Sequence, residues 1–155
     1  MYSYTPDGKT EYNISHRKII VKFKSGISFE EKSKIVKRYP LLVTLNESML
    51  LPSPKVALLE FANSAIHDDD ILTCIEQLNQ ESNIDYANLF LEYHDGSLQG
   101  ITDRFYVKLK SISDYSKLVE ISKQNHVKIE SIYEYDPLVY FIKVNKQSNG
   151  NALQI

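Results

Sequence analysis

Residues 21–25 read VKFKS, and residues 107–111 read VKLKS. The two pentapeptides differ at a single position and lie 86 residues apart. Each stands in a stretch that alternates apolar and polar side chains, which is the two-residue period of a half-buried β-strand. A turn and then a charged, helix-like stretch follow each of them. We therefore expect the chain to contain two copies of one small α/β unit.

The alternation assigns a face to each side chain in these two strands. Three apolar residues face inward in each copy, namely Ile19, Val21 and Phe23 in the first and Phe105, Val107 and Leu109 in the second. The alternate positions face outward, and among them are Lys22, Lys24, Tyr106, Lys108 and Lys110. We take these five outward side chains as the candidate protein-docking face of the sheets.

The rest of the first copy predicts a strand-helix-strand-strand-helix-strand order. Ser28 and Glu31 have the spacing of a capping box and start the first helix, which Pro40 ends. Further strands are predicted over residues 41–51, 55–62 and 84–93, with a second helix opening at Asp68. This order is that of a ferredoxin-like unit, whose sheet is antiparallel, so the predicted class is α+β.

The second copy repeats this pattern but lacks its last helix and strand. The predicted organisation is an N-terminal arm over residues 1–17, a first ferredoxin-like unit over 18–94, a linker over 95–102 and an incomplete second unit over 103–155. In a complete unit the second helix covers half of the sheet and the fourth strand protects an edge. We therefore expect the second unit to expose apolar surface and an unpaired edge strand.

Composition narrows the classes of partner. The 155 residues include 18 basic and 20 acidic side chains, which gives a net charge of −2 and favours neither nucleic acid nor an anionic membrane. No run approaches the 18 apolar residues of a membrane span. The single cysteine, Cys74, excludes an internal disulfide framework and a multi-cysteine zinc site.

No stretch carries a recognisable catalytic or metal-binding pattern. The four histidines (His16, His67, His94 and His126) are far apart, and none has a ligand at helical spacing. The run Asp68–Asp70 points its carboxylates about 100° apart on a helix, so it fits the start of a helix better than an ion site. Cys74 lies on the apolar stripe of that helix, which predicts an inert thiol. We expect a protein that is not an enzyme and needs no cofactor.

The second copy resembles a known family. Its stretches 105–110, 114–125, 137–144 and 146–153 are similar in order and character to the amino-terminal prodomains of subtilisin-like serine proteases. The likeness is to the fervidolysin-type prodomains of secreted subtilases of Bacteroides-type bacteria, and it extends more loosely over residues 1–94.

The resemblance implies a function without catalysis. A prodomain of this family is a ferredoxin-like module that packs its sheet on the protease and acts as folding chaperone and inhibitor, with its carboxyl-terminal tail in the active-site cleft. The implied partner is a subtilisin-like protease domain, in the same chain or another, and the implied location is secreted, periplasmic or in the cell envelope. The inhibitory tail and the protease domain have no counterpart in these residues.

Two alternatives remain open from the sequence. The first is a stand-alone interaction domain of the same fold that associates with itself through the open second unit. The second is an ACT-like domain that senses a small molecule, which predicts a glycine-bearing loop after the first strand. Ser25-Gly26 fits that expectation faintly, and the second copy has Ser111-Ile112 there.

Overall fold

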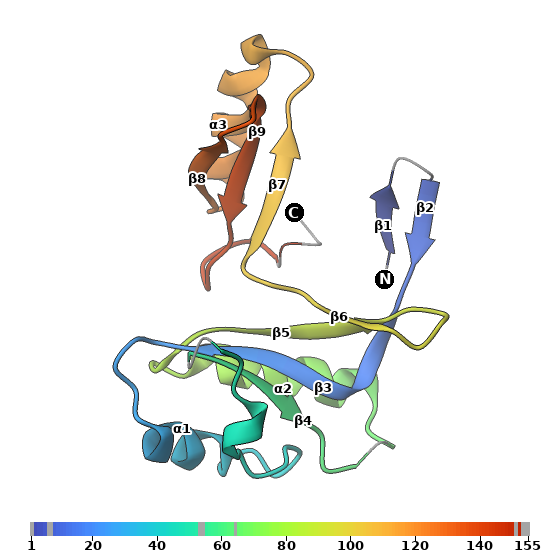
Figure 1. Ribbon diagram of the computed structural model, residues 1–155, viewed down its shortest axis with the longest axis vertical. Coiled ribbons are helices and arrows are strands. Elements are labelled where there is room, and N and C mark those ends of the chain that lie inside the picture. The colour runs from blue at the N-terminus through green and yellow to red at the C-terminus, as the bar shows by residue number, and fades with distance from the viewer. Residues whose placement is uncertain (1, 6–7, 53–54, 64, 151, 153–155) are drawn as a thin grey trace. The chain divides into compact units, whose positions relative to one another are not determined.

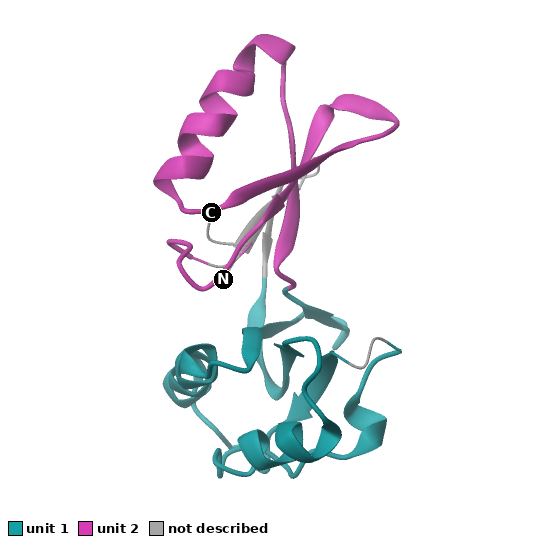
Figure 2. Ribbon diagram, turned by 90° about the vertical axis from the view of Figure 1, so that its left-hand side faces the viewer, with its two compact units in different colours: residues 1–101 teal, residues 102–155 magenta. Residues whose placement is uncertain are grey.

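The structure is a computed structural model that describes residues 2–5, 8–52, 55–63, 65–150 and 152. The chain divides into two compact units, Met1–Ile101 and Thr102–Ile155 (Figure 2). Both units combine antiparallel sheets with a few helices, so the molecule is a mixed α+β protein.

Unit 1 is built on a four-stranded sheet of order β4-β3-β5-β6 (Figure 1). Its elements are β1 (Tyr2–Thr5), β2 (Gly8–Glu11), β3 (Asn13–Phe23), α1 (Phe29–Val36), the 3-10 helix η1 (Glu47–Met49), β4 (Val56–Glu60), α2 (Asp68–Gln80), β5 (Ile84–Glu92) and β6 (Leu98–Gly100). Strands β1 and β2 pair with each other in a separate hairpin. The central strand β3 is antiparallel to both β4 and β5.

The helices of unit 1 form as the sequence predicts. The backbone N–H of Glu31 donates to Ser28 Oγ at 3.2 Å, and the Glu31 carboxylate accepts from the Ser28 backbone N–H at 3.0 Å, which completes the capping box of α1. Helix α2 buries the predicted stripe of Ile71, Cys74, Ile75 and Leu78. The inward residues Ile19, Val21 and Phe23 of β3 are fully buried in this core.

Three sequence expectations fail in unit 1. Residues 41–51 are not a strand, because the Asn46 side chain accepts a hydrogen bond from the Ser48 N–H and caps η1, leaving only isolated bridges at Leu42 and Leu50. Strand β3 starts at Asn13, inside the predicted arm. Leu98–Gly100, inside the predicted linker, forms β6 against β5.

Unit 2 is a three-stranded sheet of order β7-β9-β8 with one helix. Its elements are β7 (Arg104–Lys108), the 3-10 helix η2 (Ile112–Asp114), α3 (Tyr115–Gln124), β8 (Lys128–Tyr133) and β9 (Asp136–Lys143). A small core joins Leu118 of α3 to Leu109, Tyr140 and Ile142, so α3 covers one face of the sheet. Strands β7 and β8 are its two edges.

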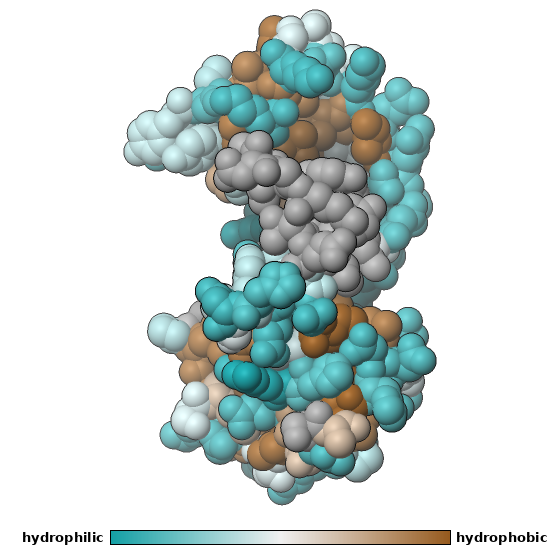
Figure 3. Space-filling model, turned by 90° about the vertical axis from the view of Figure 1, so that its right-hand side faces the viewer, coloured by the Kyte–Doolittle hydropathy of each residue, from teal (hydrophilic) through white to brown (hydrophobic). Residues whose placement is uncertain are grey.

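Among the residues whose side chains the structure describes, unit 2 exposes more large hydrophobic side chains than unit 1, as expected. Its exposed large hydrophobic side chains are Tyr106, Ile112, Tyr115, Ile121, Ile132, Tyr133 and Tyr135, against Phe29, Leu41, Leu51 and Leu72 in unit 1. Figure 3 shows hydrophobic residues reaching the surface of both units among hydrophilic ones. The inward positions of β7 are Phe105 and Val107, and both are only half-buried.

Candidate protein-docking site

The face of the second sheet opposite α3 gathers aromatic and aliphatic side chains. We call it the outer face and define it by Tyr106, Lys108, Val139 and Phe141. Register places Tyr106 opposite Phe141 and Lys108 opposite Val139 on neighbouring strands. Tyr106 is 71% exposed. No helix or strand among the described residues of unit 2 covers this face.

A shallow hollow opens beside the two central rings of the outer face. Its volume is about 320 Å³, and its lining residues are Arg104, Phe105, Tyr106, Glu130, Ser131 and Phe141. The ring of Tyr133 meets the Phe141 ring edge-on at 5.9 Å and the Tyr135 ring at 5.4 Å. The hollow has room for one large side chain of a partner, and its lining contains both aromatic residues and the Arg104–Glu130 ion pair.

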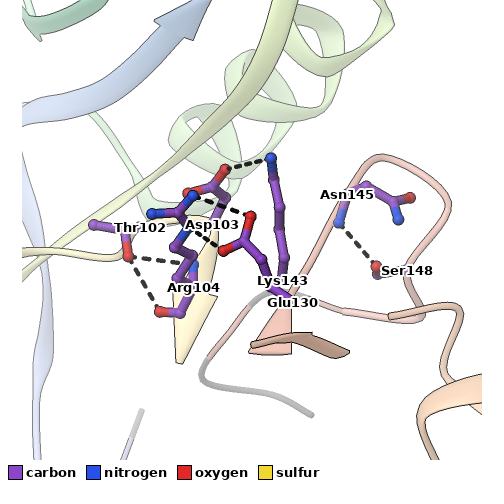
Figure 4. Close-up of polar contacts among 7 residues, drawn as sticks. All are labelled: Thr102, Asp103, Arg104, Glu130, Lys143, Asn145 and Ser148. Atoms are coloured by element: carbon purple, nitrogen blue, oxygen red, sulfur yellow. Dashed lines mark hydrogen bonds and ion pairs between the residues drawn. The ribbon is translucent and has the colours of Figure 1, made fainter. Parts of the chain in front are cut away.

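Ion pairs surround the outer face and hold its cations in place. Arg104 Nε lies 2.8 Å from Glu130 Oε2, and Lys143 Nζ lies 3.7 Å from Asp103 Oδ2 (Figure 4). Lys108 Nζ lies 2.8 Å from Asp136 Oδ2, and its hydrogen bond is the main reason why the pKa of Asp136 is lowered. These three cations each have a carboxylate beside them, and Tyr106, Val139 and Phe141 form the middle of the face.

The turn after β9 closes the end of α3. The Ser148 hydroxyl donates to the His126 carbonyl at 2.9 Å, and the Asn149 side chain donates to the Gln124 carbonyl at 2.8 Å. The Asn145 N–H in turn donates to Ser148 Oγ (Figure 4). The stretch 146–153, part of the family resemblance, therefore begins with residues that bind the C-terminal carbonyls of α3. Residues 151 and 153 lie outside the described part of the chain.

The predicted docking residues are divided between the two units. Lys22 lies on β3 and Lys24 follows it, whereas Tyr106 and Lys108 lie on β7 and Lys110 follows that strand. Lys22 is half-buried, and its ammonium lies 5.5 Å from the centre of the Tyr86 ring. The other four side chains are exposed.

Sequence reasoning missed two parts of the outer face. Val139 and Phe141 stand between the inward residues of β9, and the period of two could have assigned them outward once the partner strand was known. The Arg104–Glu130 pair depends on the register of β7 and β8 on β9, for which the sequence gives no local signal.

Two groups of unit 1, the Cys74 thiol and the Tyr39 phenol, have raised pKa values. Cys74 is buried, and desolvation raises the pKa of its thiol to about 11, so it is protonated at neutral pH. Beside it is a hollow of about 170 Å³ that Tyr39 also lines. Burial, together with a hydrogen bond to Glu81, raises the pKa of the Tyr39 phenol to about 12.

One histidine–carboxylate contact was not foreseen. His16 Nε2 lies 2.7 Å from Asp68 Oδ1, and this contact joins β3 to the start of α2. His94 and Asp95, the pair that are neighbours in sequence, lie in the turn before β6, where Asp95 accepts a hydrogen bond from the Ser97 N–H. The first contact joins a strand to a helix start, and the second lies within a turn.

Within the described ranges, no three His, Cys, Asp or Glu side chains lie close enough to hold a metal ion. None of the helices described is long and apolar enough to cross a membrane. Comparison with protein-family models, curated proteins and solved structures finds no match to the chain.

Proposed function

We propose that this chain is a non-catalytic, prodomain-like module that docks on a subtilisin-like serine protease and acts as its folding chaperone and inhibitor. The observation that carries the proposal is the outer face of unit 2. It is a sheet face with an exposed Tyr106, a neighbouring Phe141 and a side-chain-sized hollow. Exposed aromatic anchors inside a ring of charged groups are typical of protein interfaces.

The strand orders support the ferredoxin-like part of the proposal. In a ferredoxin-like unit the first strand is central, with the third strand on one side and the fourth on the other. Unit 1 has this order in β4-β3-β5, and the bridges of Leu42 and Leu50 lie on the far side of β4, where a second strand belongs. Unit 2 has the order β7-β9-β8, which corresponds to the first, third and second strands.

The proposed mechanism is a contact between preformed surfaces. A rigid sheet supplies apolar area for burial at a small cost in conformational entropy. The ion pairs around the outer face orient the partner more than they strengthen binding, since exposed pairs contribute little net free energy. On this proposal Tyr106 is the central anchor, and Phe141 with the hollow receives a side chain of the protease.

The test is a titration of a subtilisin-like protease with the chain, using a chromogenic peptide substrate. Turnover should slow at micromolar chain concentrations. Tyr106→Asp should weaken inhibition about thirtyfold, the equivalent of about 2 kcal/mol for a central aromatic anchor.

The matched control is Ile121→Asp, which places the same charge on an exposed apolar residue of α3 in the same unit. It should change inhibition by less than about twofold, because it lies away from the proposed contact. No slowing at micromolar concentrations, or an equal loss in both variants, contradicts the proposal.

A further inference from the structure

Among the strands that the structure describes, only β9 pairs with β7, so one side of the β7 backbone has no strand beside it. Leu109 N–H donates to the Leu138 carbonyl at 2.8 Å, and Val144 N–H donates to the Asp103 carbonyl at 2.9 Å. These two bonds fix the ladder, so the odd-numbered residues of β7 bond to β9. The backbone N–H and C=O groups of Tyr106 and Lys108 therefore point away from β9, to the edge where the sheet of unit 2 ends.

In unit 1, the corresponding edge of β3 is paired with strand β5. Phe23 N–H donates to the Lys55 carbonyl at 2.7 Å, so the odd-numbered residues of β3 bond to β4. The even-numbered residues Ile20 and Lys22 bond to β5, opposite Asn88 and Tyr86. With the offset of 86 residues, Ile20 and Lys22 correspond to Tyr106 and Lys108.

In unit 1, two aromatic side chains of β5 lie beside lysines of β3, and these contacts indicate which side chains can pair with the equivalent edge of β7. Lys18 Nζ lies 5.7 Å from the centre of the Phe90 ring, and Lys22 Nζ lies 5.5 Å from the centre of the Tyr86 ring. Such contacts between a cation and an aromatic ring are attractive. Arg104 and Lys108 are the counterparts of these two cations in unit 2, and both lie on the outer face of β7.

We propose that the free edge of β7 binds an extended segment of a partner protein as an added antiparallel strand. The segment has the pattern aromatic, small, polar, aliphatic, aromatic, as in residues 86–90. Its two aromatic rings lie opposite Lys108 and Arg104, and its central polar residue pairs with Tyr106. Main-chain hydrogen bonds provide the affinity, and the alternate side chains provide the selectivity.

The partial exposure of the side chains on the inner face of β7 also favours an added strand. Ile19 and Val21 are fully buried beside β5, whereas their counterparts Phe105 and Val107 are half-buried. An added strand places its small and aliphatic residues beside Phe105 and Val107 and increases their burial. The occupant therefore satisfies the backbone groups and the apolar side chains of β7 together.

A second copy of β7 is a poorer occupant. Antiparallel pairing of two β7 strands about Tyr106 places Arg104 opposite Lys108 of the other copy, twice. A shift of two residues in one direction places Arg104 opposite Lys110. A shift in the other direction needs the backbone N–H and C=O of Arg104, which are already bonded to the Thr102 hydroxyl. Like charges directly opposite each other destabilise a sheet, so the charges of β7 favour a different chain.

Hydrogen exchange of the full chain tests the open edge first. The amides of Tyr106 and Lys108 should exchange at least about tenfold faster than those of Phe105 and Val107, which are bonded to β9. Equal protection at all four positions means that the edge is already occupied in the free chain, by another part of the molecule or by a second copy, and overturns the proposal.

The second test adds a synthetic peptide of residues 83–92, with blocked ends, to isotopically labelled full chain. Saturable NMR shifts should centre on Tyr106 and Lys108, and their amides should become protected. In β5 the backbone of Asn88 faces β3, whereas that of Ala87 faces away and bonds to the Asn79 side chain. A methyl group on the Asn88 nitrogen should therefore weaken binding about tenfold or more, and one on the Ala87 nitrogen by less than about twofold.

Absence of binding at millimolar peptide, or equal loss from both methylated peptides, overturns the proposal. Neither measurement involves a protease, and both report on backbone hydrogen bonds at the edge of β7, whereas the inhibition experiment changes a side chain of the outer face. The inhibition experiment and the exchange experiment can therefore fail independently.

Discussion

Strands β3 and β7 lead into nearly identical pentapeptides, VKFKS and VKLKS, but differ in their surroundings. Ile20 of β3 is 6% exposed, and Tyr106 at the same position of β7 is 71% exposed. The correspondence extends without a gap into the helices, where Ile35 of α1 is 5% exposed and Ile121 of α3 is 51% exposed. Local sequence determines which elements form, and neighbouring elements determine how much of each is buried.

The neighbours in question are α2 and β5. In unit 1 they flank β3, and the end of α1 is joined to α2 by Arg38 Nη2, which lies 2.8 Å from Glu81 Oε2, and by the Tyr39 hydroxyl. Unit 2 has no counterpart of either element among its described residues. The two units can therefore be compared position by position, because the described part of unit 2 has no counterpart of α2 and β5.

Substitution of the two helix isoleucines should give the largest contrast. Ile35→Ala should lower the free energy of unfolding by about 3 kcal/mol, because it leaves a cavity in a packed core. Ile121→Ala should cost less than about 1 kcal/mol, because half of the side chain already contacts solvent. Urea unfolding followed by NMR signals of each unit measures both values, and equal losses would mean that the two helices are equally packed.

The two strand valines should show the same contrast on a smaller scale. Val21→Ala should cost about 2 kcal/mol, and Val107→Ala about 1 kcal/mol. The same unfolding measurement applies, and the chemistry removed is identical. If the edge of β7 binds the peptide of residues 83–92, the cost of Val107→Ala should rise when the peptide is present. A larger loss for Val107 than for Val21 contradicts the burial contrast.

The helix caps provide a third contrast. Ser28→Ala should destabilise α1 by about 1 kcal/mol, since it removes a capping box. Asp114, the N-cap of α3, makes no side-chain cap hydrogen bond, so Asp114→Ala should cost about 0.5 kcal/mol or less, mainly through the helix dipole. The capping box holds the pKa of Glu31 below its usual value, so its contribution should also disappear as the pH falls through that lowered pKa. Thermal unfolding of the two variants at neutral and acid pH distinguishes them.

Alkaline pH should lower the free energy of unfolding of unit 1, and these groups should have no effect on it at neutral pH. The unfolded chain loses the Cys74 proton near pH 9 and the folded chain near pH 11, so unfolding is favoured progressively between these values. Tyr39 acts in the same direction between pH 10 and about 12. Below pH 8 a thiol reagent should label Cys74 only on the time scale of unfolding. Fast labelling of the native chain at pH 7.5 contradicts the buried thiol.

Much of this fold could be predicted from local patterns. The capping box of Ser28 and Glu31, the apolar stripe of α2 and the faces of β7 all depend on residues close in sequence, and all three are found. The strand predicted over residues 41–51 was wrong. Their apolar content is typical of a strand, but the Asn46 side chain accepts a hydrogen bond that favours a 3-10 turn.

The candidate site was less accessible to prediction, because it depends on contacts between distant residues. Tyr106 and Lys108 were assigned to it from alternation alone, whereas Phe141 and Glu130 join them only through the register of three strands. Tyr115 and Ile121 of α3 lie at helical spacing from the buried Leu118, yet both are exposed. A periodic pattern identifies the side that an element offers for packing without showing that something packs on it.

The hydroxyl of Thr102 has a consequence for solubility. It accepts from the Arg104 N–H at 3.3 Å and donates to the Arg104 carbonyl at 3.1 Å. Both backbone groups of the first residue of β7 on this edge are therefore already hydrogen-bonded within the chain. Within the described part of the chain, only Tyr106 and Lys108 then have backbone groups of β7 that point to this edge without a partner strand, and lysines occupy positions 108 and 110. Short, charged edge strands disfavour edge-to-edge association between molecules, which leads to fibrils. We therefore expect the protein not to aggregate at high concentration.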